Sequence, residues 1–418
     1  MAGEVTPLAA LRSFRASLPA RARLYVGGCS GEPLGIAEAF RAAPDLAAGL
    51  TFVGQWVPGL NATDWASLSP HAQAETTFLA PALRPSFEAG RTRILPMTYF
   101  QSWDWLCHAP LDGAVLLVSP PDQEGNVSLG VSPDFGPALL ARTDLPLLAL
   151  INPEMPAPRH SVKAPLSRFI WIAEEARPLA SAPPSPLAPA FTAIAGHIAG
   201  LVQAGAALQF GIGNVQQAAL TALAGRKGLS VWSGIVSDPV LGMLDADPAL
   251  PITTGVAVGT EALYRRLADE PRVRFLPVCE THNIARLAAL RRFTAINSVL
   301  EVDLFGQANA EFIRGRQVSG TGGLTDFLRG ARASQGGIGI TALVSTAAGG
   351  AVSRIVPQLA PDATSVARAD MDVVITEHGS AHLRGLDLDA RAEALIAVAD
   401  PAHQDALANA WDDMRGKM

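Results

Sequence analysis

Short apolar runs alternate with helix-compatible stretches along the first half of the chain. Residues 24–26 form one such run, which ends at two glycines, and residues 36–40 have the pattern of a following helix. Further candidates for buried strands lie at residues 94–97, 114–118 and 147–151. Continuous apolar runs of this kind are typical of parallel strands covered by helices on both faces. The pattern therefore predicts an α/β layered domain.

The second half of the chain repeats this alternation. A helical spacing of apolar residues over 194–202 leads into an apolar run at residues 207–210. Later strand candidates lie at residues 230–232, 274–277, 338–344 and 373–376. We therefore expect a second sheet, parallel or mixed, with helices of its own.

Residues 177–190, which read RPLASAPPSPLAPA, interrupt both patterns. Proline removes a backbone donor and disfavours helix in the residue before it, so the segment has the character of an extended or semi-rigid linker. A length of 418 residues allows two or three domains. We predict an N-terminal α/β domain over residues 1–180, a linker over 181–190 and a C-terminal α/β domain over 191–418.

Composition narrows the class of protein. Hydrophobic residues make up 49% of the chain and charged residues 17%, with a formal net charge of −6, as in a well-buried soluble protein. No run of lysine and arginine suggests a nucleic-acid surface, and no segment reaches the roughly eighteen apolar residues of a membrane span. The first residues lack the basic and apolar stretches of a secretory signal, so we expect a cytoplasmic protein.

The side chains that most often bind metals are scattered along the chain. Cys29, Cys107 and Cys279 are far apart and form no CxxC pair, and the histidines show no HxxxH or HExxH spacing. We therefore predict thiols in a reducing compartment, no metal site and no permanently bound cofactor.

A strand-to-helix turn at Gly211-Ile212-Gly213 carries the clearest chemical signal. Glycines there allow positive φ and a close approach of a ligand to the backbone. The free N–H groups at the start of the following helix favour an anionic group. A GxG turn alone is equally compatible with a tight turn that binds nothing.

Five sequence blocks set this turn in a wider context. Together, and in this order, they resemble the acetyl-CoA hydrolase/transferase family, close to the 4-hydroxybutyrate and butyrate CoA-transferases, from about residue 23 to nearly the C-terminus. The blocks are VSPPDQEGNVSLG at 118–130, ALQFGIGNVQQAAL at 207–220, AINSVLEVDLFGQ at 295–307, SGTGGLTDF at 319–327 and TEHGSAHLRG at 376–385.

The resemblance implies two open α/β domains with mostly parallel sheets and a cleft between them. It also implies coenzyme A or acyl-CoA as a substrate, with a small carboxylate or another acceptor as the second partner. A homo-oligomer, most simply a dimer, is expected by the same analogy. Matched residue by residue, the family's CoA contacts fall on Gly211, Ile212, Gly213, Asn214 and Val215, and its second glycine loop, against the thioester end, falls on Gly320, Gly322 and Gly323.

The catalytic position departs from the family pattern. Relatives carry a segment like GIHTEMFSDG after the GIG turn, and its glutamate is the covalent nucleophile. Here the aligned stretch is LSVWSGIVSDP at 229–239, in which Ser237 and Asp238 keep the register. The glutamate position then falls on Gly234 and the flanking histidine position on Trp232. Because glycine offers no carboxylate, ordinary ping-pong transfer through a glutamyl-CoA thioester is not expected.

Two acidic residues are weak substitutes for that nucleophile. Asp238 lies four residues beyond Gly234, but active relatives carry a matching residue beside their glutamate. Glu280 lies close to His282 in the stretch VCETH, where a carboxylate or an imidazole is able to activate water as a general base. A purely structural position is the alternative for each of them.

A further acidic pair lies in the third block. Glu301 and Asp303 share one face of a strand by alternation. Paired carboxylates are compatible with acid–base chemistry, but we interpret these two as acceptors for backbone N–H groups of a loop.

Three functions fit these residues, and we favour the first. It is an acyl-CoA-processing enzyme of the CoA-transferase or acyl-CoA hydrolase type, in which a glycine loop polarises the thioester carbonyl and water or an acceptor attacks. The second is a non-catalytic protein that binds CoA or acyl-CoA. The third is an enzyme that transfers or condenses the acyl group onto a non-carboxylate acceptor. All three require CoA binding, and the fold alone does not separate them.

Overall fold

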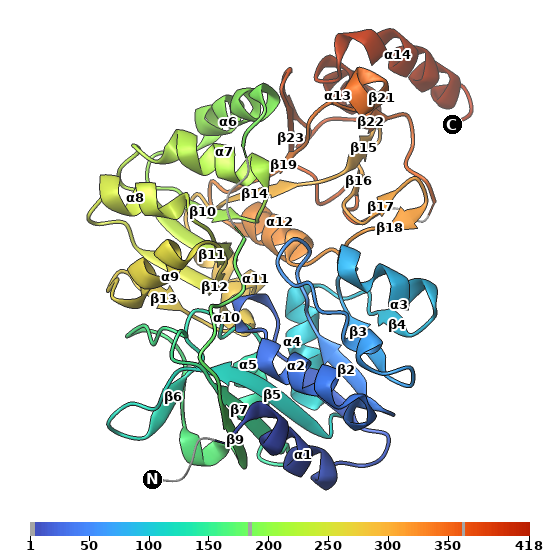
Figure 1. The fold of residues 1–418 in the computed structure, drawn as a ribbon. Helices are drawn as coiled ribbons and strands as arrows, with labels where there is room; N and C mark the ends of the chain where they lie inside the picture. The colour runs from blue at the N-terminus through green and yellow to red at the C-terminus, as the bar shows by residue number, and fades with distance from the viewer. Residues whose placement is uncertain (1–4, 183–185, 362–363) are drawn as a thin grey trace. The chain divides into compact units, whose positions relative to one another are not determined.

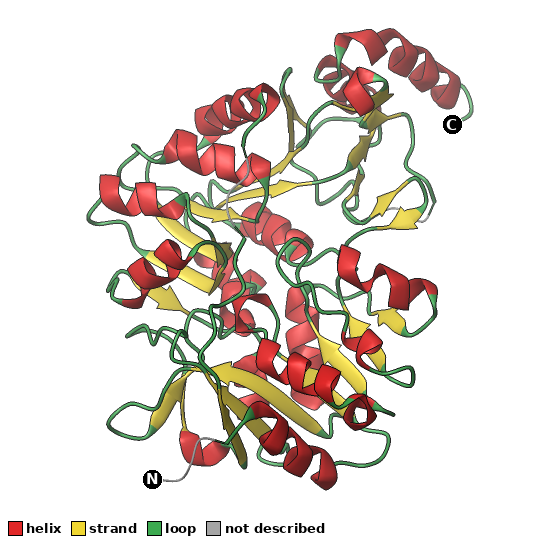
Figure 2. Ribbon diagram, viewed as in Figure 1, coloured by secondary structure: helices red, strands yellow, loops and turns green. Residues whose placement is uncertain are grey.

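The computed structural model describes residues 5–182, 186–361 and 364–418. The chain forms two compact units, one of Met1–Pro183 with Thr253–Thr281 and one of Pro184–Ile252 with His282–Met418. The two main sheets are mostly parallel and alternate with helices along the chain (Figures 1 and 2). This architecture confirms the α/β class predicted from the apolar runs.

The sheet of the first unit has seven strands, all parallel to their neighbours. From β1 the sheet grows in two directions. The strands β2 to β4 extend it on one side, and β5, β7 and β9 extend it on the other. In sheet order the strands are β4 (Thr92–Ile94), β3 (Gln73–Thr76), β2 (Thr51–Gly54), β1 (Arg23–Val26), β5 (Gly113–Val118), β7 (Leu147–Ile151) and β9 (Trp171–Glu174).

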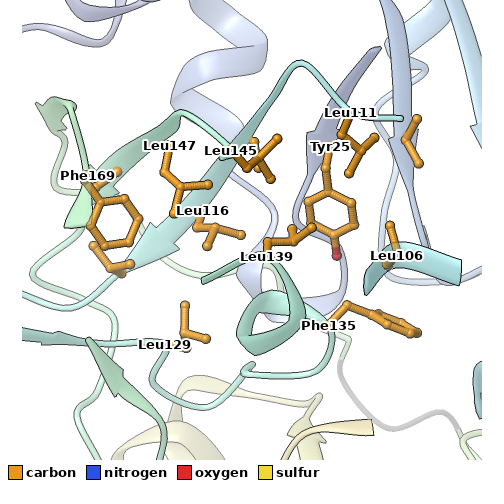
Figure 3. Close-up of a cluster of buried hydrophobic side chains, with 14 of the residues drawn as sticks. Tyr25, Leu106, Leu111, Leu116, Leu129, Phe135, Leu139, Leu145, Leu147 and Phe169 are labelled. Carbon is orange, nitrogen blue, oxygen red and sulfur yellow. The ribbon is translucent and has the colours of Figure 1, made fainter. Parts of the chain in front are cut away.

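Helices cover both faces of this sheet. On one face Phe14 of α1 packs against Trp171, and Phe40 of α2 packs against Phe52 of β2. The opposite face, drawn in Figure 3, buries Tyr25 and Leu116 beneath residues of α4 and α5. The helices of this unit are α1 (Pro7–Ser17), α2 (Leu34–Ala42), α3 (Arg84–Glu88), α4 (Tyr99–His108), α5 (Gly136–Leu140), α9 (Glu261–Ala268) and α10 (Val278–Thr281).

The second main sheet has eight strands. The pairs from β11 through β23 are parallel, whereas β24 runs antiparallel to β23. In sheet order the strands are β13 (Val273–Phe275), β12 (Ile252–Ala257), β11 (Ser230–Val236), β10 (Ala207–Phe210), β14 (Thr294–Ser298), β19 (Ile338–Ala342), β23 (Val373–Thr376) and β24 (Gly379–His382).

Helices of the second unit pack along the strands of this sheet. Phe327 and Ala331 of α12 join Leu287 of α11 in a core cluster with residues of β10 and β14. None of the described helices has the length and apolar character that crossing a membrane requires. The helices are α6 (Pro189–Leu201), α7 (Asn214–Leu223), α8 (Val240–Ala246), α11 (Ile284–Ala289), α12 (Leu324–Ala333), α13 (Leu388–Ala397) and α14 (Pro401–Arg415).

Short strands complete the fold outside the two main sheets. Three of them form a small sheet with the order β16-β15-β22, and the others form two-stranded pairs. They are β15 (Glu301–Asp303), β16 (Ala308–Asn309), β22 (Ile355–Val356), the pair β6 (Asn126–Ser128) and β8 (Lys163–Pro165), the pair β17 (Phe312–Ile313) and β18 (Arg316–Gln317), and the pair β20 (Thr346–Ala347) and β21 (Val352–Ser353).

The apolar runs locate the central strands well and the outer strands poorly. The runs at 114–118 and 147–151 lie on β5 and β7, but the run at 94–97 meets β4 only at Ile94. The polar sequence QAET of β3 carried no signal, because only alternate residues of that strand are buried. Of the predicted linker at 181–190, residues 183–185 lie outside the described residues, and α6 begins at Pro189.

Residues 253–281 group with the first unit rather than with their neighbours in sequence. Backbone hydrogen bonds hold them there: Ala257 N–H donates to the carbonyl of Val131 at 2.9 Å, and Val278 N–H donates to that of Asp134 at 3.2 Å. The Val278 side chain also joins the apolar cluster of that unit. The division into domains at 1–180 and 191–418 stays a prediction.

Candidate active site in the second unit

Chain order reverses at the centre of the eight-stranded sheet. β10 is flanked on one side by β11 and on the other by β14, from which later strands continue outward. In open α/β sheets, ligands bind beyond the carboxyl ends of the strands at such a reversal. The GIG turn, residues 211–213, follows β10 at this point, and Ser298 ends β14 beside it.

The GIG turn joins β10 directly to α7. Gly213 immediately precedes the helix with a φ of +115° and no side-chain cap, in a backbone region that side chains strongly disfavour. A β-carbon on Gly213 would come no closer than 3.4 Å to another described group, so the turn is uncrowded. The unpaired first N–H groups of the ten-residue helix α7 favour an anionic ligand there.

Three side-chain amides brace this turn. With its amide oriented so that both ends are satisfied, Gln216 donates to the Ile212 carbonyl at 3.0 Å and accepts from Ser298 N–H at 3.1 Å. The buried side chains of Gln209 and Asn297 exchange hydrogen bonds of 3.0 and 3.3 Å between β10 and β14. None of these three amides was predicted from the sequence. A polar residue inside an apolar strand, such as Gln209, is the signal that would have found one of them.

β11 places Gly234 beside the GIG turn. β10 and β11 pair in parallel with Leu208 opposite Val231, and the same register continued by three residues sets Gly234 opposite Gly211. The buried Ser233 hydroxyl donates to the Phe210 carbonyl at 2.7 Å, which ties the two strand ends together. Ser233 therefore has a structural hydrogen bond.

The imidazole of His282 lies over Gly234. An ideal β-carbon on Gly234 would stand 2.6 Å from Cε1 and 2.8 Å from Nε2 of that ring. A β-carbon on Gly323 would stand 2.5 Å from Cδ2 and 2.6 Å from Nε2 of the same ring. The Phe327 ring packs against the imidazole with centroids 4.5 Å apart. One side chain thus fills the space beside two glycines, and both must lack a side chain for it to fit.

His282 is neutral in the folded protein. The residue is 3% exposed, and burial lowers the pKa of its imidazole to about 3. A neutral imidazole carries one N–H donor and one nitrogen acceptor. The side chain that the structure sets against Gly234 therefore supplies hydrogen-bonding capacity and shape, and no charge.

The second glycine loop leads into α12. Gly322 has a φ of +53°, and Gly323 precedes the helix without a side-chain cap. Through His282 the structure brings this loop together with Gly234, and the strand register adds Gly211 to the same place. Residues distant in sequence thus form one small, glycine-lined site at the strand ends.

The two acidic substitutes lie on different elements. Asp238 follows β11 in the turn before α8, half-buried, and its carbonyl accepts from Leu241 N–H at 3.0 Å. Glu280 lies on α10 in the first unit, where burial and that carboxylate raise the pKa of the neighbouring Cys279 thiol to about 11. The VCETH stretch contains both Glu280 and His282, and it is His282 that lies against Gly234.

The acidic pair of the third block is structural. The carboxylate of Asp303 accepts from Gln307 N–H at 2.8 Å and Leu359 N–H at 3.3 Å, as expected of a residue that organises a loop. Glu301 instead accepts from the side-chain amide of Asn309 at 2.9 Å, so its interpretation as a backbone acceptor was wrong. Among the residues that the structure describes, no group of three or more His, Cys, Asp or Glu side chains is arranged to hold a metal ion.

Comparison with known proteins supports the same assignment of family. Residues 259–411 match the acetyl-CoA hydrolase/transferase C-terminal domain. The 4-hydroxybutyrate coenzyme A transferase of Clostridium kluyveri is 32% identical over 400 residues, which cover 93% of this chain and 93% of that protein.

Two solved structures share the fold along nearly their whole length. RipA from Yersinia pestis is similar with a TM-score of 0.89 and 26% identity. A 4-hydroxybutyrate CoA-transferase from Porphyromonas gingivalis is similar with a TM-score of 0.79 and 29% identity. Each match covers 98% of this chain and 97% of the other. With this similarity in sequence and fold, the chain belongs to the acetyl-CoA hydrolase/transferase family.

Proposed function

We propose that the protein acts on acyl-CoA thioesters as a divergent CoA-transferase or acyl-CoA hydrolase that forms no glutamyl intermediate. The observation that carries the proposal is the packing of His282 into the space that a β-carbon on Gly234 would need. Family membership supports the substrate class, since the Clostridium kluyveri relative is a 4-hydroxybutyrate coenzyme A transferase. The departure from its chemistry rests on this chain's own residues.

CoA binding is assigned to the two glycine turns. The pyrophosphate is a suitable anion for the start of α7, where Gly213 leaves the N–H groups uncovered. The residues proposed to contact it run from Gly211 to Val215. The thioester is assigned to the loop of Gly320, Gly322 and Gly323, whose backbone N–H groups are suited to a developing negative charge.

The proposed reaction is direct attack on the thioester. An attacking water adds to the carbonyl carbon, the loop N–H groups stabilise the oxyanion, and the C–S bond then breaks to give the free acid and CoA, whose thiolate takes the proton of the water. A carboxylate acceptor that attacks in the same way forms a mixed anhydride, and the CoA thiolate then attacks the acceptor's own carbonyl carbon, which gives the new acyl-CoA and releases the first carboxylate. His282 stays uncharged throughout, because its pKa of about 3 lies far below physiological pH. It serves as a neutral hydrogen-bonding group, as some active-site imidazoles with lowered pKa values do.

A covalent route through residue 234 would be severely impaired. Loss of a nucleophile lowers turnover by roughly 10⁶ in a well-studied hydrolase. Asp238 and Glu280 remain weak alternatives for the nucleophile. Neither is needed if water or the acceptor attacks directly.

The same packing also favours a second candidate, a protein that binds CoA or acyl-CoA without turnover. In that case His282 simply closes the former catalytic position, while the uncrowded GIG turn keeps its ligand. Transfer of the acyl group to a non-carboxylate acceptor is the third possibility. Turnover separates the second candidate from the others, and the identity of the acceptor separates the remaining two.

The test combines binding with turnover on the full chain. Calorimetry measures CoA and acetyl-CoA binding. A thiol reagent measures CoA release from acetyl-, butyryl- and 4-hydroxybutyryl-CoA with and without an amine acceptor, and mass spectrometry measures the new acyl-CoA formed with a carboxylate acceptor. Release of CoA or formation of a new acyl-CoA above the spontaneous rate supports an enzyme, and saturable binding with neither product supports the second candidate. Absence of binding by the folded protein at millimolar ligand would contradict every form of the proposal.

The family analogy extends the proposal to assembly and location. A homodimer is proposed because two-fold assemblies are the commonest oligomers, and a cytoplasmic location follows from the composition. Light scattering after size exclusion tests the first part. A monomer mass at micromolar concentration would refute it.

A further inference from the structure

A surface cavity of about 630 Å³ lies at the amino-terminal ends of the first four strands of the seven-stranded sheet. Its walls come from the residues that precede or begin β1, β2, β3 and β4 (dark to mid blue in Figure 1). Ligands of open α/β sheets usually bind at the carboxyl ends of strands. This cavity lies at the opposite edge of the sheet, at the amino-terminal ends of the strands, and is therefore distinct from the usual ligand position.

The cavity is basic. Arg21, Arg23, His71 and Arg91 line it, and no acidic side chain does, although the whole chain carries a formal charge of −6. The arrangement concentrates positive charge in one hollow.

The guanidinium groups of the cavity differ in how they are engaged. Arg23 pairs with Glu75 and lies 5.6 Å from the Trp105 ring, but its Nε is buried and has no partner in the described part of the chain. Arg91 donates to the carbonyls of Ala66 and Ser69 and to no carboxylate.

Arg21 is exposed. Within residues 5–182, 186–361 and 364–418, neither a hydrogen bond nor an ion pair engages its side chain. Arg21 thus brings positive charge to the cavity without a bonded carboxylate among the described residues, whereas the charge of Arg91 is partly offset by the nearby carboxylate of Asp64.

The framework of the cavity is rigid. Gly49, at a φ of +79°, lets the chain pass so close to Ala20 that a β-carbon would stand 2.5 Å from its carbonyl oxygen. Thr51 N–H donates to the Ala22 carbonyl at 2.8 Å, and Gln73 N–H donates to the Leu50 carbonyl at 2.9 Å. These bonds connect the backbone segments that form the walls of the cavity.

We infer that this cavity binds a small molecule that carries a diphosphate or longer phosphate chain. Guanidinium groups bind phosphate oxygens in bidentate fashion, and three arginines with an imidazole around one hollow match more than one phosphate. The volume is within the range of small-molecule sites and exceeds what a single phosphate fills. This site belongs to the first unit alone and is independent of the proposed acyl-CoA chemistry.

Calorimetry of the full chain with inorganic pyrophosphate is the first test. We expect saturable binding that weakens as ionic strength rises, because the cavity is open to solvent. Arg21→Glu should weaken binding by about tenfold or more, since it reverses a charge that contacts the anion. Arg21→Lys should retain part of the affinity, because it keeps the charge and loses only the bidentate geometry.

Two controls locate the anion. Arg159→Glu makes the same charge change at an exposed residue after β7, beyond the opposite ends of the strands, and should leave the affinity unchanged. Gly213→Ala alters the GIG turn, to which the pyrophosphate of CoA is assigned above, so this variant distinguishes pyrophosphate bound at that turn from pyrophosphate bound at the basic cavity. Thermal unfolding of each variant verifies that it is folded.

Three results would overturn the inference. They are no binding of pyrophosphate by wild type, equal binding by wild type and Arg21→Glu, and loss of binding in Gly213→Ala alone. If Arg21→Glu instead changes the mass measured by light scattering while pyrophosphate does not bind, the cavity is part of a contact between copies, and the inference is wrong.

Discussion

The imidazole of His282 occupies the position that a β-carbon on Gly234 would need, with Cε1 only 2.6 Å from that point. Gly234→Ala should therefore lower the free energy of unfolding by ~1–3 kcal/mol, the usual effect of overpacking. Gly225→Ala is the matched control, because a β-carbon there meets no atom within 4 Å.

Urea denaturation of both variants checks this prediction. A double-mutant cycle with His282→Ala adds a second measurement, since the penalty at Gly234 should largely disappear once the ring is removed. An equal effect of Gly234→Ala in the presence and absence of the imidazole would show that the ring is not the obstacle.

Restoring the glutamate should fail unless His282 is also changed. Wild type should form no glutamyl-CoA adduct, and Gly234→Glu alone should regain at most a trace of acetyl-CoA:carboxylate transfer. Gly234→Glu combined with His282→Ala should do better, and adding Trp232→His should help further, because Trp232 lies on the same strand face. Full activity is not expected, since covalent attack depends on fractions of an ångström.

Borohydride reduction of acyl-CoA-treated protein, followed by peptide mass spectrometry, checks the adduct. An adduct at Asp238 or Glu280 in wild type would contradict the loss of covalent chemistry. That result would identify the replacement nucleophile directly.

CoA binding should depend on Gly213 beyond its effect on stability. Gly213→Ala places a side chain at a φ of +115°, which destabilises the turn by ~1–3 kcal/mol and covers the start of α7. Gly228→Ala is the control, because its φ of +73° is also unfavourable and a β-carbon there meets no atom within 4 Å. Calorimetry should show CoA affinity reduced about tenfold or more in the first variant and unchanged in the second. Equal affinities in both would remove the GIG turn from the CoA site.

Stability should fall in mild acid because of His282. The folded pKa of about 3 lies below the ordinary 6.5, so the unfolded chain takes up a proton that the folded protein refuses. The contribution of the neutral His282 to the free energy of unfolding is fully present above pH 6.5 and is lost as pH falls toward 3. Between pH 6.5 and about 5 the loss is ~2 kcal/mol. Urea denaturation should show a shallower acid dependence in His282→Gln, and parallel curves would refute the assignment.

Asp134 should have the opposite pH dependence. Burial raises the pKa of this carboxyl, which lies 4.0 Å from the Cys29 thiol, to about 7. A raised folded pKa means that its contribution is present below pH 3.8 and is lost as pH rises through about 7. The free energy of unfolding of Asp134→Asn, measured relative to that of wild type, should therefore rise by ~2–3 kcal/mol as the pH is raised from about 5 to about 7. Thermal or urea unfolding at both pH values measures the difference, and a constant offset between the two proteins would contradict it.

The sequence by itself determined the fold class and the location of the GIG turn. The apolar runs at 114–118 and 147–151 lie on central strands because such strands are buried on both faces, so each residue must be apolar. Outer strands such as β3 bury only alternate residues, and their short patterns carry little signal. The glycines of the turn were readable because positive φ restricts the choice of residue locally.

Only the tertiary structure decided what lies against Gly234. His282 is separated from it by a segment that belongs to the first unit, so no local pattern relates the two residues. The basic cavity is likewise built from four separate strand beginnings, each of which contributes one or two unremarkable polar residues. Local sequence encodes backbone preference and burial over a few residues. Close packing between distant segments depends on how the whole chain is folded, and it is this packing that filled the space beside Gly234 with an imidazole.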